Sequence, residues 1–269
     1  MRHLMLAHDR VDLHVRLSIS NTLCPILHQL PDLQTITLNA INGAKIGNDY
    51  FLLNLPEKIT SINVAEVVDF RAVEKQFPHL VHCNAPWEPG MAVHCQKMPN
   101  LRRLLFHGVP ESFHFFTIMK QLESFTWNLE CFEVQDWNQF TRSVHPTLHT
   151  LHIQCSHFEQ ILDMEDALQL PFLKVFYLDF LGGAKDLPRR IKRVLPQVKH
   201  FHAYLHGVKE PHHIEWLRNY VPLYAHHSGL ETFSVYFLYG DAMSMRLTYY
   251  RGDKSAFLSR QVAHSFGTD

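Results

Sequence analysis

A short pattern of apolar positions, apolar-x-x-apolar-x-apolar, recurs along this chain and predicts a strand at each occurrence. The successive starts are 26, 21, 21, 21, 26, 25, 25 and 32 residues apart, and such spacing is typical of a repeat architecture. We therefore expect nine short strands, one in each repeat. The pattern begins at Leu33, Ile59, Leu80, Leu101, Leu122, Leu148, Leu173, Val198 and Leu230.

Proline marks the start of most of these repeats. Seven of the 14 prolines stand just before the first apolar position of the pattern. Proline has no N–H group and favours extended geometry in the residue before it, so it ends one element and introduces the next. These prolines are Pro31, Pro56, Pro78, Pro99, Pro146, Pro171 and Pro196.

The segments between the strands carry apolar residues at helical spacing. Residues 65–77, 133–144 and 156–170 each place apolar side chains three or four positions apart, which predicts amphipathic helices. Strands joined by helical crossovers run parallel, so the chain is expected to form a parallel sheet covered by helices. One repeat cannot bury its apolar face alone, but a stack of nine or ten can.

This arrangement resembles leucine-rich repeats, and its irregular spacing resembles the degenerate repeats of the F-box/LRR proteins. The resemblance covers roughly residues 10–240. It implies an α/β, leucine-rich-repeat-like solenoid with a curved parallel sheet of about nine or ten short strands and helices on the outer face. The ninth repeat position, usually asparagine or cysteine in the family, holds neither residue here, so the turns must close in another way. A mixed α/β domain with a non-solenoid sheet remains the alternative.

The whole chain, residues 1–269, is expected to form one such solenoid. Residues 1–30 would be an N-terminal cap that includes a first strand within 11–20, and residues 31–239 would hold the irregular repeats. Residues 240–269 lose the pattern and would form a C-terminal cap and tail, with MSMRLTYY, residues 243–250, as a covering strand. Atypical ends are a general property of repeat proteins.

The composition limits the cellular locations and the kinds of partner that we expect for this protein. The net charge of -1 gives no general attraction to nucleic acid or to an anionic membrane. The five cysteines include no CxxC pair, which argues against a disulfide framework. No apolar run of about 18 residues occurs, so we expect no membrane partner and an intracellular location, cytoplasmic or nuclear.

A period of two in each strand places positions four and six of the pattern in the core and positions three, five and seven on the opposite face. That face would be mostly polar, with histidine and tyrosine concentrated in the later repeats, a mixture that suits protein recognition. The outward positions of the last four repeats are Thr150, His152, Gln154, Val175, Tyr177, Asp179, His200, His202, Tyr204, Thr232, Ser234 and Tyr236. The predicted partner-binding residues are Arg103, His107, His152, Tyr177, His200, His202 and Tyr204.

Two alternatives of other classes stay open. His200 and His202 share a strand face and could both ligate one metal ion, which would make the protein a metal-dependent enzyme. The basic run over residues 185–199, which contains RRIKR, could contact nucleic acid, although no basic stripe continues on neighbouring repeats. No catalytic motif is found, so we predict no enzyme activity, no metal and no cofactor.

The predicted function is therefore a protein-interaction module that displays side chains from several repeats on one preorganised surface. The resemblance implies substrate receptors of cullin-type ubiquitin ligases, which carry an F-box before the repeats. No F-box is recognised here, so no adaptor-binding residue is carried over. Cullin-ligase subunits would be partners only if a longer form carries an F-box.

Overall fold

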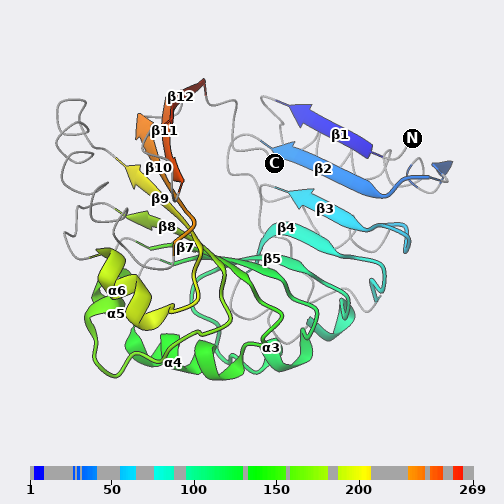
Figure 1. The fold of residues 1–269 in the computed structure, drawn as a ribbon. Coiled ribbons are helices and arrows are strands. Elements are labelled where there is room, and N and C mark those ends of the chain that lie inside the picture. Colours follow the sequence, from blue (N-terminus) through cyan, green and yellow to red (C-terminus); the bar gives the residue numbers. More distant parts are fainter. Residues whose placement is uncertain are drawn as a thin grey trace. The chain divides into compact units, whose positions relative to one another are not determined.

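The computed structural model describes residues 3–8, 27, 29–30, 32–40, 55–64, 76–87, 95–129, 133–155, 158–180, 187–206, 230–239, 243–250 and 257–262. The chain divides into two compact units (Figure 1). The first comprises Met1–Trp127 and Ser143–Thr147, and the second comprises Asn128–Arg142 and Leu148–Asp269. The expected single solenoid, with caps over 1–30 and 240–269, stays a prediction.

The first unit is built on parallel strands that pair in chain order. All four described pairings, from β1 to β5, are parallel. The sixth strand follows β5, because the amides of Glu123 and Ser124 donate to the Arg102 carbonyl. The elements are β1 (His3–His8), β2 (Thr35–Ala40), β3 (Ser61–Val64), β4 (His82–Trp87), β5 (Arg103–His107), the short helix α3 (Phe115–Ile118) and β6 (Ser124–Asn128).

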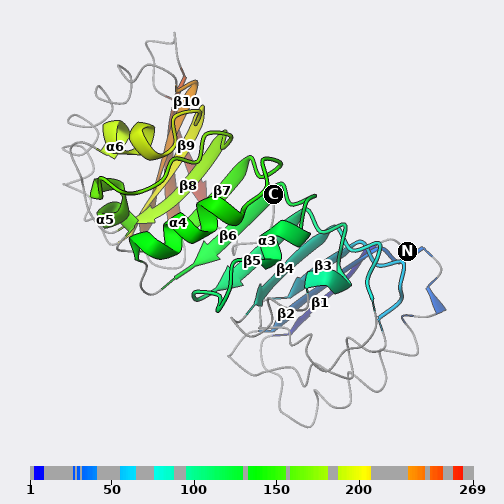
Figure 2. The same cartoon turned by 90° about the horizontal axis from the view of Figure 1, so that it is seen from below.

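The second unit repeats the alternation of strand and helix and then ends in antiparallel strands. Strands β7 to β10 pair in parallel, and β10, β11 and β12 pair antiparallel. Helices α4, α5 and α6 lie on one face of this sheet (Figure 2). The elements are α4 (Val134–Ser143), β7 (Thr150–Gln154), α5 (Phe158–Asp163), β8 (Val175–Phe180), α6 (Leu187–Val194), β9 (His200–His206), β10 (Thr232–Tyr239), β11 (Met243–Tyr250) and β12 (Phe257–Val262).

The fold is thus α/β with parallel strands, as predicted, and all nine predicted strands occur as β2 to β10. The predicted covering strand over residues 243–250 is confirmed as β11. The predicted strand within 11–20 lies outside the described residues, whereas β1 at His3–His8 was not predicted.

Pro78 and Pro99 each sit in a tight turn that starts the next strand. The amide of Leu80 donates to the carbonyl of Phe77 over 3.2 Å, across Pro78. Leu101 and Met98 enclose Pro99 in the same way, at 3.2 Å. A fixed φ near -65° suits the second position of such a turn, so proline lowers the entropy cost of forming it.

Successive repeats then begin pairing through the same contact. The amides of Arg102 and Arg103 both donate to the carbonyl of Val81, at 2.7 and 3.2 Å. In the second unit, the amides of Lys199 and His200 donate to the Lys174 carbonyl, at 2.8 and 3.1 Å. This shared start fixes the strand register, so equivalent side chains of neighbouring repeats lie side by side.

Single side chains from neighbouring repeats close the turns in place of an asparagine ladder. In the second unit, the indole N–H of Trp137 donates to the carbonyl of Leu168 over 2.7 Å. Asn138 donates to the Asp166 carbonyl over 3.0 Å and accepts from the Leu168 amide over 2.7 Å. Since buried backbone groups need partners, these contacts satisfy the irregular segment that follows α5.

The first unit uses a similar device with different residues. The indole N–H of Trp127 donates to the carbonyl of Gly108 over 2.8 Å. Gly108 has a φ of 78°, a value that glycine adopts without steric cost. The Asn100 amide reaches the Pro78 carbonyl over 2.8 Å. These described repeats are therefore each tied to a neighbouring repeat by a different side-chain contact.

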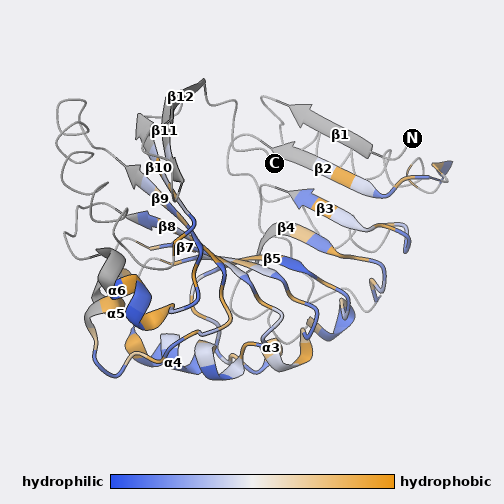
Figure 3. Cartoon of the chain, viewed as in Figure 1, coloured by the Kyte–Doolittle hydropathy of each residue, from blue (hydrophilic) through white to orange (hydrophobic). Residues whose placement is uncertain are grey.

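The cores lie between the sheets and the helices. All described side chains at pattern positions four and six of β2 to β10 are buried, which confirms the predicted period of two. Figure 3 shows hydrophobic and hydrophilic residues mixed along α4 and α6, as amphipathic helices require. In the second unit a phenylalanine ladder runs through Phe158, Phe176, Phe201 and Phe233, with centroids 5.7, 5.8 and 5.6 Å apart.

Two of the three predicted helices can be compared with the structure. The helix predicted over 133–144 is confirmed as α4. The helix predicted over 156–170 is wrong in its second half, because α5 ends at Asp163. The backbone of Asp166 and Leu168 is held instead by Trp137 and Asn138. Residues 65–75 of the third predicted helix lie outside the described residues.

Candidate functional site

The parallel register of the second unit arranges its outward side chains in rows. Tyr177 pairs with His202, and His202 pairs with Ser234 on the next strand. Asp179 pairs with Tyr204, which pairs with Tyr236. Neighbouring strands lie about 4.8 Å apart, so rings at paired positions can stack on one another.

The rings of these rows stack closely. Tyr177 and His202 have centroids 4.3 Å apart and planes inclined by 11°, and Tyr204 and Tyr236 are 4.5 Å apart at 16°. His152 stacks on Tyr204 at 5.5 Å. All five side chains are half-buried. We call His152, Tyr177, Asp179, His202, Tyr204 and Tyr236 the ring cluster.

One carboxylate belongs to the ring cluster. Nε2 of His152 lies 3.0 Å from Oδ1 of Asp179, and the two side chains are 20% and 17% exposed. The pair fixes one edge of the His152 ring, while Tyr177 and Tyr204 contact the ring at 5.5 Å each. The cluster is therefore preorganised by contacts within the sheet.

The predicted binding residues fall into both units. His152, Tyr177, His202 and Tyr204 come together as predicted. His200 lies on the same face of β9, where its Nδ1 is 2.9 Å from the Thr232 hydroxyl. The remaining two, Arg103 and His107, lie on β5 in the first unit.

The structure adds two residues that the predicted set omitted, Asp179 and Tyr236. Both occupy position seven of the pattern, the position that Tyr204 holds in the repeat between them. Selecting that whole column of positions would have found them. Ser234, in contrast, does not contribute an exposed side chain, because it is fully buried and its hydroxyl lies 3.1 Å from that of Thr248 on β11.

The alternative prediction was a metal site at His200 and His202. The part of the chain that the structure describes contains no complete set of metal ligands. No group of three or more histidine, cysteine, aspartate or glutamate side chains converges there.

Some side chains of the basic run over residues 185–199 make contacts within the fold. The guanidinium of Arg193 donates to the carbonyl of Leu162 and, over 2.8 Å, to that of Met164, at the end of α5. A cation at this position satisfies the last carbonyls of a helix. Lys199, in the same run, is paired with Glu231, with Nζ and Oε1 2.7 Å apart. Arg193 and Lys199 of the run over 185–199 are therefore both engaged within the fold.

A basic group occupies the outward face of the first unit. His82 on β4 pairs in register with Arg103 on β5, and Arg103 is exposed. Burial and then the charges of Arg103 and Arg102 lower the pKa of His82, while Glu123 acts in the opposite direction. Protonation of His82 is thus disfavoured in the folded chain.

We expect the free energy of unfolding to fall as the pH is lowered from about 7.5 to 5.5, the range in which histidine titrates. Because the folded-state pKa of His82 lies below its ordinary value of 6.5, the unfolded chain takes up the proton first. The contribution of His82 to stability is complete above that ordinary value and is lost as the pH falls toward the folded-state pKa. Urea denaturation between about pH 7.5 and 5.5 measures the loss. The variant His82→Gln should lose less than the wild type, and equal losses would contradict this account.

Among the described helices, none is long and apolar enough to cross a membrane. No protein-family model matches the chain, and no curated protein matches it either.

Proposed function

We propose that this protein is a protein-interaction module, a leucine-rich-repeat-like solenoid that binds a protein partner through its outward sheet face. The single observation that carries the proposal is the ring cluster, in which tyrosine and histidine from four parallel strands stack at 4.3 to 5.5 Å. The solenoid part of the proposal is supported by the proline turns and by the parallel pairing within each unit.

Half-buried tyrosine and histidine are well suited to such a surface. Each ring offers a large apolar area together with a polar edge, and tyrosine is enriched among residues that dominate binding energy. Because neighbouring rings already hold one another in place, little side-chain entropy is lost on binding. The mechanism is display of a rigid surface, without a chemical step.

The resemblance to degenerate F-box/LRR repeats extends the proposal to a class of function. We propose that the partner is a substrate of a cullin-type ubiquitin ligase, with this chain as a receptor or a related scaffold. Affinity capture from cells followed by mass spectrometry tests the class. Recovery of cullin-ligase subunits would support a receptor, and recovery of a partner without them would support a stand-alone scaffold.

Replacing Tyr177 or Tyr204 by alanine is expected to weaken binding of the captured partner about 30-fold. Central aromatic residues of an interface typically contribute about 2 kcal/mol each, which corresponds to this factor. Isothermal titration calorimetry with the purified partner measures the change. The variant Met164→Ala is a matched control, because Met164 is 44% exposed and follows α5, away from the cluster.

The control should bind like the wild type, and circular dichroism should show the same fold for all variants. If both tyrosine variants retain wild-type affinity, the ring cluster is not the binding surface and the proposal fails.

A further inference from the structure

A second row of outward side chains crosses the strands of the first unit. Ser61 on β3 pairs with His82 on β4, and His82 pairs with Arg103 on β5. Ser124 on β6 continues the row, because its amide donates to the Arg102 carbonyl over 2.9 Å. The four residues occupy position three of successive repeats and therefore share one face of the sheet. We call them the position-three row.

The row has an uncompensated positive charge. Arg102 is paired with Glu123, with Nη1 and Oε1 3.0 Å apart, so these two charges balance each other. Within the described part of the chain, no hydrogen bond or ion pair engages the side chain of Arg103, which is exposed. The pKa of His82, at the centre of the row, is lowered first by burial and then by the charges of Arg103 and Arg102.

We infer that the position-three row binds a carboxylate-bearing segment of a protein partner. The planar guanidinium of Arg103 can donate two parallel hydrogen bonds to one carboxylate. The hydroxyl groups of Ser61 and Ser124 and the imidazole of His82 supply further donors on either side. The inference rests on the proposed function in that it takes the ligand to be a protein.

The charge pattern favours an acidic protein segment over a nucleic acid. Binding to a phosphate backbone usually requires several cations in succession. The position-three row offers one permanent cation, and the whole chain has a net charge of -1. One cation with flanking hydroxyl groups matches one or two carboxylates.

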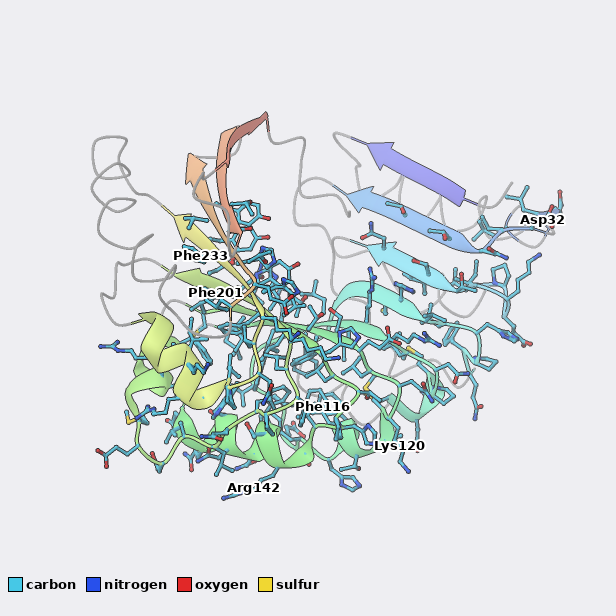
Figure 4. The ribbon with its side chains drawn as sticks, in the orientation of Figure 1. Asp32, Phe116, Lys120, Arg142, Phe201 and Phe233 are labelled. Atoms are coloured by element: carbon cyan, nitrogen blue, oxygen red, sulfur yellow. The ribbon has the colours of Figure 1, made fainter. Side chains whose placement is uncertain are left out.

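Direct peptide binding tests the inference without the cellular partner. The probe is a fluorescein-labelled peptide of alternating glutamate and serine, and its control replaces every glutamate by glutamine. Fluorescence anisotropy should show saturable binding of the glutamate peptide only, and Arg103→Gln should weaken it about tenfold by removing a charge-assisted contact. The matched control is Arg142→Gln, since Arg142 is an exposed arginine on α4 (Figure 4) and should not affect binding.

A second readout follows the histidine itself. Bound carboxylate brings negative charge to the row, so the pKa of His82, measured by NMR titration, should rise when the glutamate peptide is added. The inference is overturned if the glutamine peptide binds equally well, if Arg103→Gln binds like the wild type, or if a single-stranded RNA oligonucleotide binds more tightly than the glutamate peptide.

These outcomes are distinguishable from failure of the proposed function. If Tyr177→Ala weakens partner binding while the glutamate peptide fails to bind, the ring cluster stands and the position-three row does not. If the peptide binds while the tyrosine variants are unaffected, the row stands and the ring cluster does not.

Discussion

Replacing Trp137 by alanine is expected to lower the free energy of unfolding by about 4 kcal/mol. Trp137 is fully buried on α4, and its ring packs against Phe140 at 5.7 Å and Phe158 at 5.5 Å. The substitution creates a large cavity and also leaves the Leu168 carbonyl without the indole donor. Urea denaturation of the full chain, followed by circular dichroism, measures the loss.

Two further variants separate the causes. Trp137→Phe keeps most of the ring but loses the indole N–H, so its cost should be about 1–3 kcal/mol. Gln139→Ala lies at an exposed position of the same helix and should change stability by less than about 0.5 kcal/mol. If Trp137→Ala were no more destabilising than Gln139→Ala, the contact between α4 and the segment after α5 would not stabilise the fold.

Replacing Phe201 by alanine should cost a similar amount, about 3–5 kcal/mol. Phe201 is fully buried on β9 and stacks between Phe176 at 5.8 Å and Phe233 at 5.6 Å, both with planes inclined by 15° (Figure 4). The loss removes the middle of the phenylalanine ladder, so both neighbouring strands lose a packing partner. Hydrogen exchange should therefore accelerate at the amides of β8, β9 and β10.

The matched variants are Phe201→Leu and Gln197→Ala. Leucine fills part of the space and should cost less than alanine, whereas Gln197 is exposed in the preceding turn and should be neutral. Because Phe201 belongs to the second unit and β2 to β5 belong to the first, exchange in β2 to β5 should remain at the wild-type rate. Equal acceleration in β2 to β5 would contradict this local effect.

Most of the strands could be predicted because their causes are local. A proline turn and a period of two are both contained within about ten residues, and the turn at Pro78 and the buried Cys83 and Leu104 follow from them directly. The end of α5 could not be predicted in this way. It depends on Trp137 and Asn138, which are about thirty residues away in the sequence and capture the backbone that would have continued the helix.

The same distinction applies to the candidate site. The sequence predicted that His152, Tyr177, His202 and Tyr204 share a face, because alternation places them there. It did not predict the contact between His152 and Asp179, which joins different positions of neighbouring repeats. Nor did it predict the burial of Ser234, which depends on a strand from the C-terminal segment that lacks the repeat pattern.

Within each unit, each strand pairs with the next strand in the sequence. This order affects how the chain can fold during synthesis on the ribosome. The side-chain contacts that join neighbouring repeats link residues only 19 to 32 positions apart. Once a strand has emerged, its partner is therefore complete after a short further stretch of translation. The growing polypeptide can therefore add one strand at a time to strands that are already paired. Little apolar surface stays exposed until a distant part of the chain is synthesised.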